Sequence, residues 1–171
     1  AGELEKVCAE LARESTWVVC CGSSPSLAAD LIYRNLIVRV RAAGKRTALD
    51  SYGAPLRAGI DAVPDLLKIN RHEYEQTSGK NARTEPEVLA ALDALRGAGI
   101  RCVVLTDGER AVYAADGASV WKVVPPSITS VNPTGSGDSM LAGMLFGMEQ
   151  GWEMPAWLSF SCRSGDEVSD G

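Results

Sequence analysis

The sequence predicts an α/β fold built on a mostly parallel sheet with helices on both faces. Short, continuous apolar runs of strand length alternate along the chain with longer segments of helical periodicity. The apolar runs do not switch between apolar and polar residues, which favours strands buried on both faces. Strands of this kind that alternate with helices are typical of a parallel sheet covered on both sides.

The first half of the chain follows this alternation. Helical spacing of apolar residues and short buried runs define each expected element. The expected elements are a helix containing Leu4, Val7, Cys8 and Leu11, a strand buried on both faces at 17–21, a helix at 27–43 closed by Gly44, a weak strand at 47–49 ending at Asp50, a short helix at 56–62 and a buried strand at 66–69.

Capping signals mark the second half. Thr84 is suited to cap a helix that has Pro86 and Glu87 in its first turn and ends at Gly97 or Gly99. Strands are expected at 101–106, 112–115 and 119–124, the last two as a hairpin. After an apolar helix, the stretch 161–171 is polar and has a disorder-like composition. The sequence therefore predicts one domain at 1–160 and a disordered tail at 161–171.

Composition narrows the class of protein. A chain of 171 residues with 46% hydrophobic and 23% charged residues suits one globular domain with a real core. The net charge of −5 and a pI near 4.9 argue against nucleic acid or an anionic membrane as the main partner. The sequence has no apolar run of transmembrane length, and its first residues do not have the pattern of a signal peptide.

The five cysteines indicate a reducing compartment. Their number is odd, and Cys20 and Cys21 are adjacent within an apolar run. Such residues are usually buried, reduced thiols, which favours the cytoplasm over secretion. No cysteine or histidine pair has the spacing of a zinc site.

The run Asn132-Pro133-Thr134-Gly135-Ser136-Gly137-Asp138-Ser139-Met140-Leu141-Ala142-Gly143 is the most informative stretch. A loop of small, turn-forming residues leads into an apolar helix. Helix N-termini carry unpaired N–H groups and partial positive charge, so the backbone from Gly135 to Asp138 predicts an anion site. Gly135 and Gly137 lack a Cβ, which lets a phosphate approach this backbone closely.

Asp138 needs a separate explanation, because a carboxylate beside a phosphate is repelled by it. The role that fits is to accept a proton from a hydroxyl that attacks phosphorus. The pattern therefore indicates a phosphotransferase site.

These residues resemble a known family. The run from Asn132 to Leu145 is similar to the second signature of the PfkB (ribokinase-like) carbohydrate kinases, whose core is a Gly-x-Gly-Asp anion hole. Other family motifs have counterparts in the same order. Residues 21–25 resemble the Gly-Ser-Leu-Pro motif, and residues 50–53 resemble Asp-x-x-Gly. Residues 68–73 resemble Lys-Pro-Asn-x-x-Glu, and residues 104–108 resemble a strand that ends in Ser/Thr-x-Gly. The nearest resemblance is to the phosphosugar branch, which contains 1-phosphofructokinase, 6-phosphofructokinase-2 and tagatose-6-phosphate kinase, and it covers roughly Trp17 to Trp157.

The resemblance implies a ribokinase-like fold and a kinase that uses ATP and Mg²⁺ to phosphorylate a sugar or phosphosugar hydroxyl. It implies that Asp138 is the catalytic base, that an anion hole precedes it, and that Ser23 contacts the substrate. The anion hole is Gly135, Ser136 and Gly137, and the nucleotide-binding residues are Lys68, Asn70, Thr106, Asp107 and Gly108. Ser23, Asp50, Asn70 and Thr106 each follow an expected strand, at the edge where ligands bind in open α/β sheets.

Asn70 and Glu73 lie three residues apart at a helix start, so they could hold Mg²⁺, largely through water. They could equally be a helix N-cap and its capping-box partner. Lys68 could meet phosphate as a point charge or simply extend toward solvent. Asp50 could be a site residue or a turn former.

Other enzyme classes fit less well. A serine hydrolase elbow at Ser24 is excluded, because the following residue, Pro25, has no N–H for the oxyanion hole. A dinucleotide fingerprint fails at Met140, where the third glycine should stand.

The serious alternative is a non-catalytic, nucleotide-binding remnant of such a kinase. Family members carry sugar-binding strands and a β-lid, which often forms a dimer, before the matched region. They also carry an Ala/Gly-rich helix after the position that corresponds to Trp157 of this chain. We therefore expect the chain to hold the C-terminal, nucleotide-binding part of the domain, with the N-terminal strands and lid missing.

Overall fold

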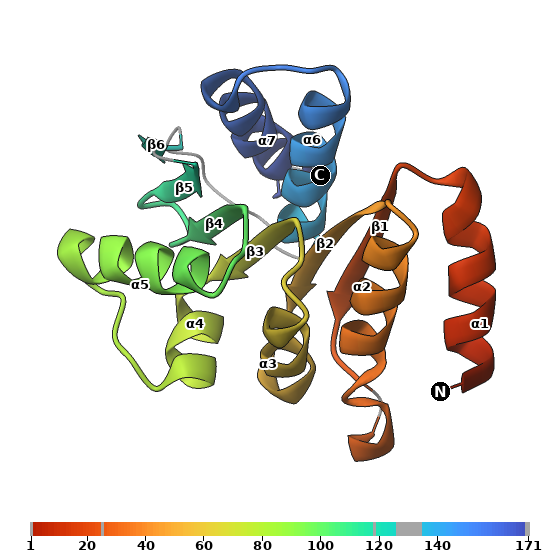
Figure 1. Ribbon diagram of the computed structural model, residues 1–171. Helices are drawn as coiled ribbons and strands as arrows, with labels where there is room; N and C mark the ends of the chain where they lie inside the picture. Colours follow the sequence, from red (N-terminus) through yellow and green to blue (C-terminus); the bar gives the residue numbers. More distant parts are fainter. Residues whose placement is uncertain (1, 25, 118, 126–134, 170–171) are drawn as a thin grey trace. The chain divides into compact units, whose positions relative to one another are not determined.

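The computed structural model describes the chain except residues 1, 25, 118, 126–134 and 170–171 (Figure 1). The chain divides into two compact units. The first contains Ala1–Thr106 and Ala115–Val120, and the second contains Asp107–Ala114 and Trp121–Gly171.

Helices and strands alternate as the sequence predicts. The helices are α1 (Gly2–Leu11), α2 (Ile32–Ala42), α3 (Gly53–Asp61), α4 (Arg71–Ser78), α5 (Glu85–Gly97), α6 (Ser136–Glu149) and α7 (Met154–Ser169), with 3₁₀ turns at Ala12–Glu14 and Leu27–Ala29. The strands are β1 (Trp17–Gly22), β2 (Arg46–Ser51), β3 (Leu66–Asn70), β4 (Cys102–Thr106), β5 (Val112–Asp116) and β6 (Ser119–Val123), which follow one another in the sheet in chain order.

The first four strands are all parallel, so their carboxyl ends meet at one edge of the sheet. The core of the first unit lies on the strands and on the inner sides of α2, α3 and α5, which pack against them. Leu49, Leu67, Ile69 and Leu105 are completely buried there. The predicted α/β fold with a mostly parallel sheet is confirmed.

Strand β1 differs from the expectation of a strand buried on both faces. Only Cys20 is buried, and Val19 is 41% exposed. The reason is position: β1 stands first in the sheet and pairs only with β2 among the described strands. A continuous apolar run therefore does not prove that both faces are covered in this chain.

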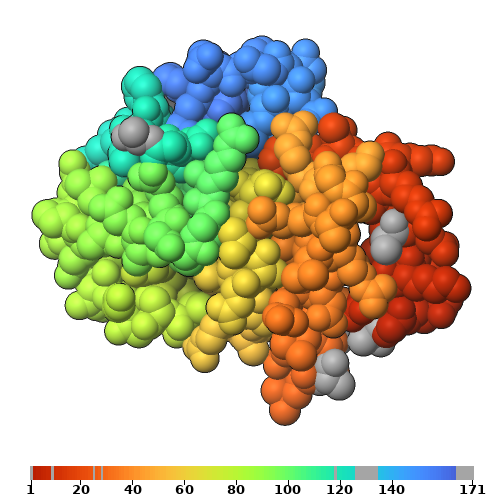
Figure 2. All heavy atoms as spheres, in the orientation of Figure 1, coloured from red at the N-terminus to blue at the C-terminus, as the bar shows by residue number. Residues whose placement is uncertain are grey.

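Helix α1, which packs beside α2 (Figures 1 and 2), also reverses part of its expected pattern. Leu4, Val7 and Leu11 are exposed, whereas Glu5 is only 6% exposed. Two side chains of α2 bind the Glu5 carboxylate: Asn35 Nδ2 donates to it at 3.0 Å, and Arg39 Nη2 lies 3.6 Å away.

The helix expected at 27–43 begins later. A 3₁₀ turn at Leu27–Ala29 comes first, and α2 starts at Ile32. Asp30 accepts a hydrogen bond from the Ser24 hydroxyl, which ties this turn to the loop after β1. An apolar periodicity alone could not locate this break.

The second unit contains a close pair of helices, α6 and α7. A Cβ placed on Gly147 would lie 2.3 Å from Trp157 Cβ, and one on Gly143 would lie 3.0 Å from Ser161 Cα. The absence of side chains at these two glycines is what allows the helices to approach.

The expected tail from 161 differs from the structure, because α7 continues to Ser169. Ser161 and Cys162 are buried. The Ser161 hydroxyl donates to Leu158 O at 2.8 Å, and the Ser164 hydroxyl donates to Phe160 O at 3.1 Å. These small polar side chains therefore make their hydrogen bonds within α7 and can still pack on α6. Residues 170–171 lie outside the described part of the chain.

Candidate functional site

An ion pair occupies the carboxyl edge of the sheet in the first unit. Lys68 Nζ lies 2.5 Å from Asp50 Oδ2, and the two side chains are only 7% and 12% exposed. Asp50 stands near the end of β2 and Lys68 on the neighbouring strand β3. The structure thus gives Lys68 a specific partner, and it does not simply extend into solvent.

Asn70 and Glu73 form a complete capping box at the start of α4. Glu73 N donates to Asn70 Oδ1 at 2.9 Å, and Asn70 N donates to Glu73 Oε2 at 2.8 Å. The structural alternative for these residues is therefore confirmed. It leaves the second Glu73 oxygen and a lone pair of the Asn70 amide oxygen for a ligand, which fits a magnesium ion held largely through water.

The charges at this edge influence one another. Burial raises the pKa of the Glu73 carboxyl, and the Asp50 charge acts in the same direction. The hydrogen bond from Asn70 N and the Lys68 ammonium both lower the pKa of Glu73. Two carboxylates and one ammonium thus share this edge of the first unit.

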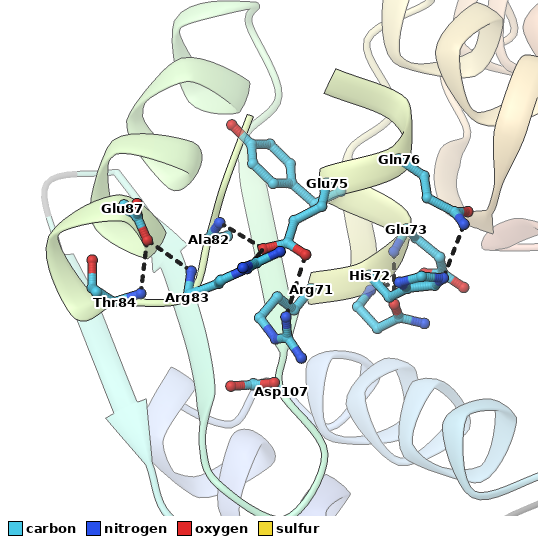
Figure 3. A network of polar contacts seen from close by, with 12 residues as sticks. Arg71, His72, Glu73, Glu75, Gln76, Ala82, Arg83, Thr84, Glu87 and Asp107 are labelled. Carbon is cyan, nitrogen blue, oxygen red and sulfur yellow. Dashed lines mark hydrogen bonds and ion pairs between the residues drawn. The ribbon is translucent and has the colours of Figure 1, made fainter. Parts of the chain in front are cut away.

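Glu75 anchors α4 to the loop that follows it (Figure 3). Its carboxylate accepts from Ala82 N at 3.1 Å and binds Arg71 and Arg83, each at 3.3 Å. The Ala82 N–H is the main reason that the pKa of Glu75 is lowered, with the two arginines adding to it. Glu75 therefore holds the loop after α4 against the helix and also pairs with Arg71, the first residue of α4.

Ser23 follows β1 at the same sheet edge, and its side chain is exposed. Its hydroxyl donates only weakly, to Ser24 O at 3.4 Å. The preceding residue, Gly22, has a φ of +80° and accepts from the Ser51 hydroxyl at 2.6 Å. This contact joins the ends of β1 and β2 and places the Ser23 loop.

Thr106 ends β4 and is the register partner of Asn70 on β3. Asp107 and Gly108 come next and belong to the second unit. They begin a turn in which Arg110 N donates to Asp107 O at 3.1 Å, and Gly108 takes a left-handed φ of +56°.

The expected anion hole and base lie at the start of α6 in the second unit. Gly135 caps the helix with a φ of +88°, a conformation that favours glycine, and Ser136 is the first helical residue. Gly137 and Asp138 follow in the first turn, where backbone N–H groups have no acceptor within the helix. The Asp138 side chain is exposed. The motif residues 132–134 lie outside the described part of the chain.

The structure brings together the first-unit residues Asp50, Lys68, Asn70 and Glu73, with Thr106 beside Asn70. The residues at 107–108 and 135–138 are described within the second unit. The sequence pattern does not by itself predict the pairing of Asp50 with Lys68. The signal for it was present, because both residues stand near the carboxyl ends of strands expected to be parallel neighbours.

Within the described residues, no helix has the length and apolar character needed to cross a membrane. All five cysteines are free thiols.

Comparison with known proteins gives a consistent result. The family model for the pfkB family of carbohydrate kinases matches residues 3–168. The 1-phosphofructokinase of Haemophilus influenzae is 32% identical over 145 residues, which is 84% of this chain and 46% of that protein. The 1-phosphofructokinase of Escherichia coli K12 is 33% identical over 127 residues, covering 74% of this chain and 41% of that protein.

Among solved structures, the tetrameric inhibited form of phosphofructokinase-2 from Escherichia coli superposes with a TM-score of 0.89 at 24% identity, covering 98% of this chain and 56% of that one. This likeness supports the fold. The chain spans about half the length of the relatives that it matches.

Proposed function

This chain belongs to the pfkB family of carbohydrate kinases, and on that premise we propose that it carries the nucleotide-binding and catalytic-base part of an ATP-dependent phosphosugar kinase. The acceptor that we favour is a fructose phosphate, because the matched relatives named above are 1-phosphofructokinases. A tagatose phosphate is the other candidate, because the sequence motifs resemble those of the phosphosugar branch. The observation that carries the proposal is the start of α6, where a left-handed glycine cap leads directly into a first turn containing an acid.

The roles follow from chemistry. The N–H groups of the α6 first turn, from Ser136 to Asp138 after the Gly135 cap, bind phosphate oxygens. Asp138 accepts the proton of the attacking hydroxyl as the oxygen of that hydroxyl bonds to phosphorus and ADP leaves. Lys68, Thr106, Asp107 and Gly108 bind the nucleotide, and Ser23 contacts the phosphosugar.

Magnesium neutralises phosphate charge when it is bound. Asn70 and Glu73 would hold it largely through water, since the capping box leaves oxygen lone pairs on both side chains. We place the kinase in the cytoplasm, which is consistent with five free thiols. We also propose that the family-length protein forms a homodimer.

A second candidate is a nucleotide-binding remnant without catalysis. Both candidates share the nucleotide site and differ only in phosphate transfer.

The test is to express the longest protein encoded by the reading frame that contains this segment. Transfer of phosphate from Mg·ATP to fructose 1-phosphate, fructose 6-phosphate or tagatose 6-phosphate is then measured with the matched variant Asp138→Asn. The kinase proposal predicts transfer that depends on magnesium and on Asp138. ATP binding without transfer would leave only the remnant.

A further inference from the structure

Among the ion pairs of the described residues, the one between Asp50 and Lys68 is unusual because it is almost fully buried. The Lys68 side chain is 7% exposed and the Asp50 side chain 12% exposed. In the surface pair Arg101–Asp116, by contrast, the side chains are 79% and 38% exposed. A charge removed from water in this way needs a specific reason.

Stability alone is a poor reason. The desolvation of two charges commonly offsets their attraction, and a well-packed apolar pair of similar volume is often at least as stable. The pair also lies at the carboxyl edge of parallel strands β2 and β3, where open α/β sheets bind ligands. Its position therefore favours a role in binding.

The donors of Lys68 are only partly used. An ammonium carries three N–H groups, and Asp50 Oδ2 is the one acceptor recorded for Lys68 within the described part of the chain. Two donors thus remain for a ligand that approaches the sheet edge. Phosphate oxygens suit them, because an ammonium binds phosphate as a compact point charge.

We propose that Asp50 is a positioning residue, which holds the Lys68 ammonium so that its two remaining N–H groups bind phosphate oxygens of the nucleotide. The inference rests on the proposed function, because it takes the nucleotide as the ligand. Asp50 itself does not touch the phosphate in this arrangement, since two anions repel each other. Its effect on binding passes through Lys68.

A first experiment needs no ligand. In NMR spectra of the 171-residue chain, the buried Lys68 ammonium should give a slowly exchanging Nζ–H signal. Asp50→Asn should abolish this signal and Asp50→Glu should keep it, because only the carboxylate holds the ammonium. Asp116→Asn, which removes the carboxylate of an exposed ion pair, should leave it unchanged.

A second experiment measures binding of Mg·ATP and of inorganic tripolyphosphate by NMR titration. Asp50→Asn and Lys68→Met should each weaken binding about tenfold or more, the usual effect of losing a charge-assisted contact. The double variant should bind no more weakly than either single one, since both remove the same interaction. Asp50→Glu should restore most of the affinity.

Three results would overturn the inference. One is a persistent Lys68 signal in Asp50→Asn, and another is additive losses in the double variant, which would mean that Asp50 acts independently of Lys68. The third is an unchanged dissociation constant in Asp50→Asn. If Gly137→Val still abolishes binding in that third case, the proposed nucleotide site stands and only the role of Asp50 is wrong. If the parent chain binds neither probe, the proposed function fails as well.

Discussion

Glu73 and Glu87 occupy the same capping-box position in two helices, but their pKa values are shifted in opposite directions. Burial raises the pKa of Glu73, with the charge of Asp50 adding to it. The N–H groups of Thr84 and Arg83, each 2.9 Å from Glu87 Oε2, lower the pKa of Glu87. Both carboxylates belong to the same kind of capping box, so the difference comes from what surrounds each carboxylate.

This difference predicts opposite effects of pH on stability. Because its pKa is raised on folding, Glu73 binds more protons in the folded state, and its contribution to stability falls as pH rises through the window between its unfolded and folded pKa values. Glu87 has a lowered pKa, so its contribution is present above the unfolded pKa and is lost as pH falls toward the folded one.

The matched variants are Glu73→Gln and Glu87→Gln, since glutamine can also serve in a capping box. The difference in free energy of unfolding, variant minus parent, should increase from pH 4 to pH 7 for Glu73→Gln. The same difference should decrease from pH 4 to pH 7 for Glu87→Gln. Urea unfolding at both pH values measures each difference. Parallel shifts in the two variants would contradict the assignment of the two environments.

Asp138 is the residue on which catalysis depends in the proposed mechanism. In the family-length protein, Asp138→Asn should lower kcat by roughly 10²–10⁴, the usual contribution of a general base, with little change in ATP affinity. Initial rates and ATP binding are measured on the same preparation. Turnover within a few-fold of the parent would remove Asp138 from this role.

The residues of the candidate site were predicted unevenly. The spacing of Asn70 and Glu73 was enough to predict both a capping box and a possible magnesium site, because both depend on three residues of local separation. The ion pair of Lys68 with Asp50 joins residues 18 apart on two strands. Its existence depends on strand register, which the residue pattern alone does not fix.

At the scale of elements, the contact between α6 and α7 depends on glycine. Gly147→Ala should lower the free energy of unfolding by about 1–3 kcal/mol, the usual effect of overpacking, because its Cβ would lie 2.3 Å from Trp157 Cβ. Thermal unfolding should show a Tm lower by several degrees.

Gly97→Ala in α5 is the matched control, because a Cβ there meets nothing within 4 Å. This variant should be neutral or gain up to about 1 kcal/mol from higher helix propensity. An equal Tm for the two variants would show that α6 and α7 can separate without loss of stability.

Elements with capping signals were predicted best. Helix α5 begins after Thr84 and ends at Gly97 as expected. Helix α7 was missed beyond 160, because its polar composition hides the close packing of Ser161 and Cys162. The burial of β1 was misjudged for the opposite reason: an apolar run shows what could be covered, while neighbouring chain segments decide what is covered.

At the scale of the whole molecule, the chain spans about half the length of the relatives that it matches. The 171-residue chain should transfer no measurable phosphate to fructose 1-phosphate, fructose 6-phosphate or tagatose 6-phosphate. The reason is that placement of the acceptor supplies several kcal/mol of barrier lowering. A coupled ADP-release assay with each sugar measures this, and magnesium-dependent transfer by the purified chain would mean that its site is complete.

The central claim is that the start of α6 binds the nucleotide phosphates. The most direct measurement is an amide NMR titration of the 171-residue chain with Mg·ATP, compared with Gly137→Val. We expect weak binding that shifts the amide signals of residues 135–138. Gly137→Val should abolish this binding, because the valine side chain fills the space in which phosphate meets the backbone. Amide signals that do not move, or that move equally in the variant, would contradict it.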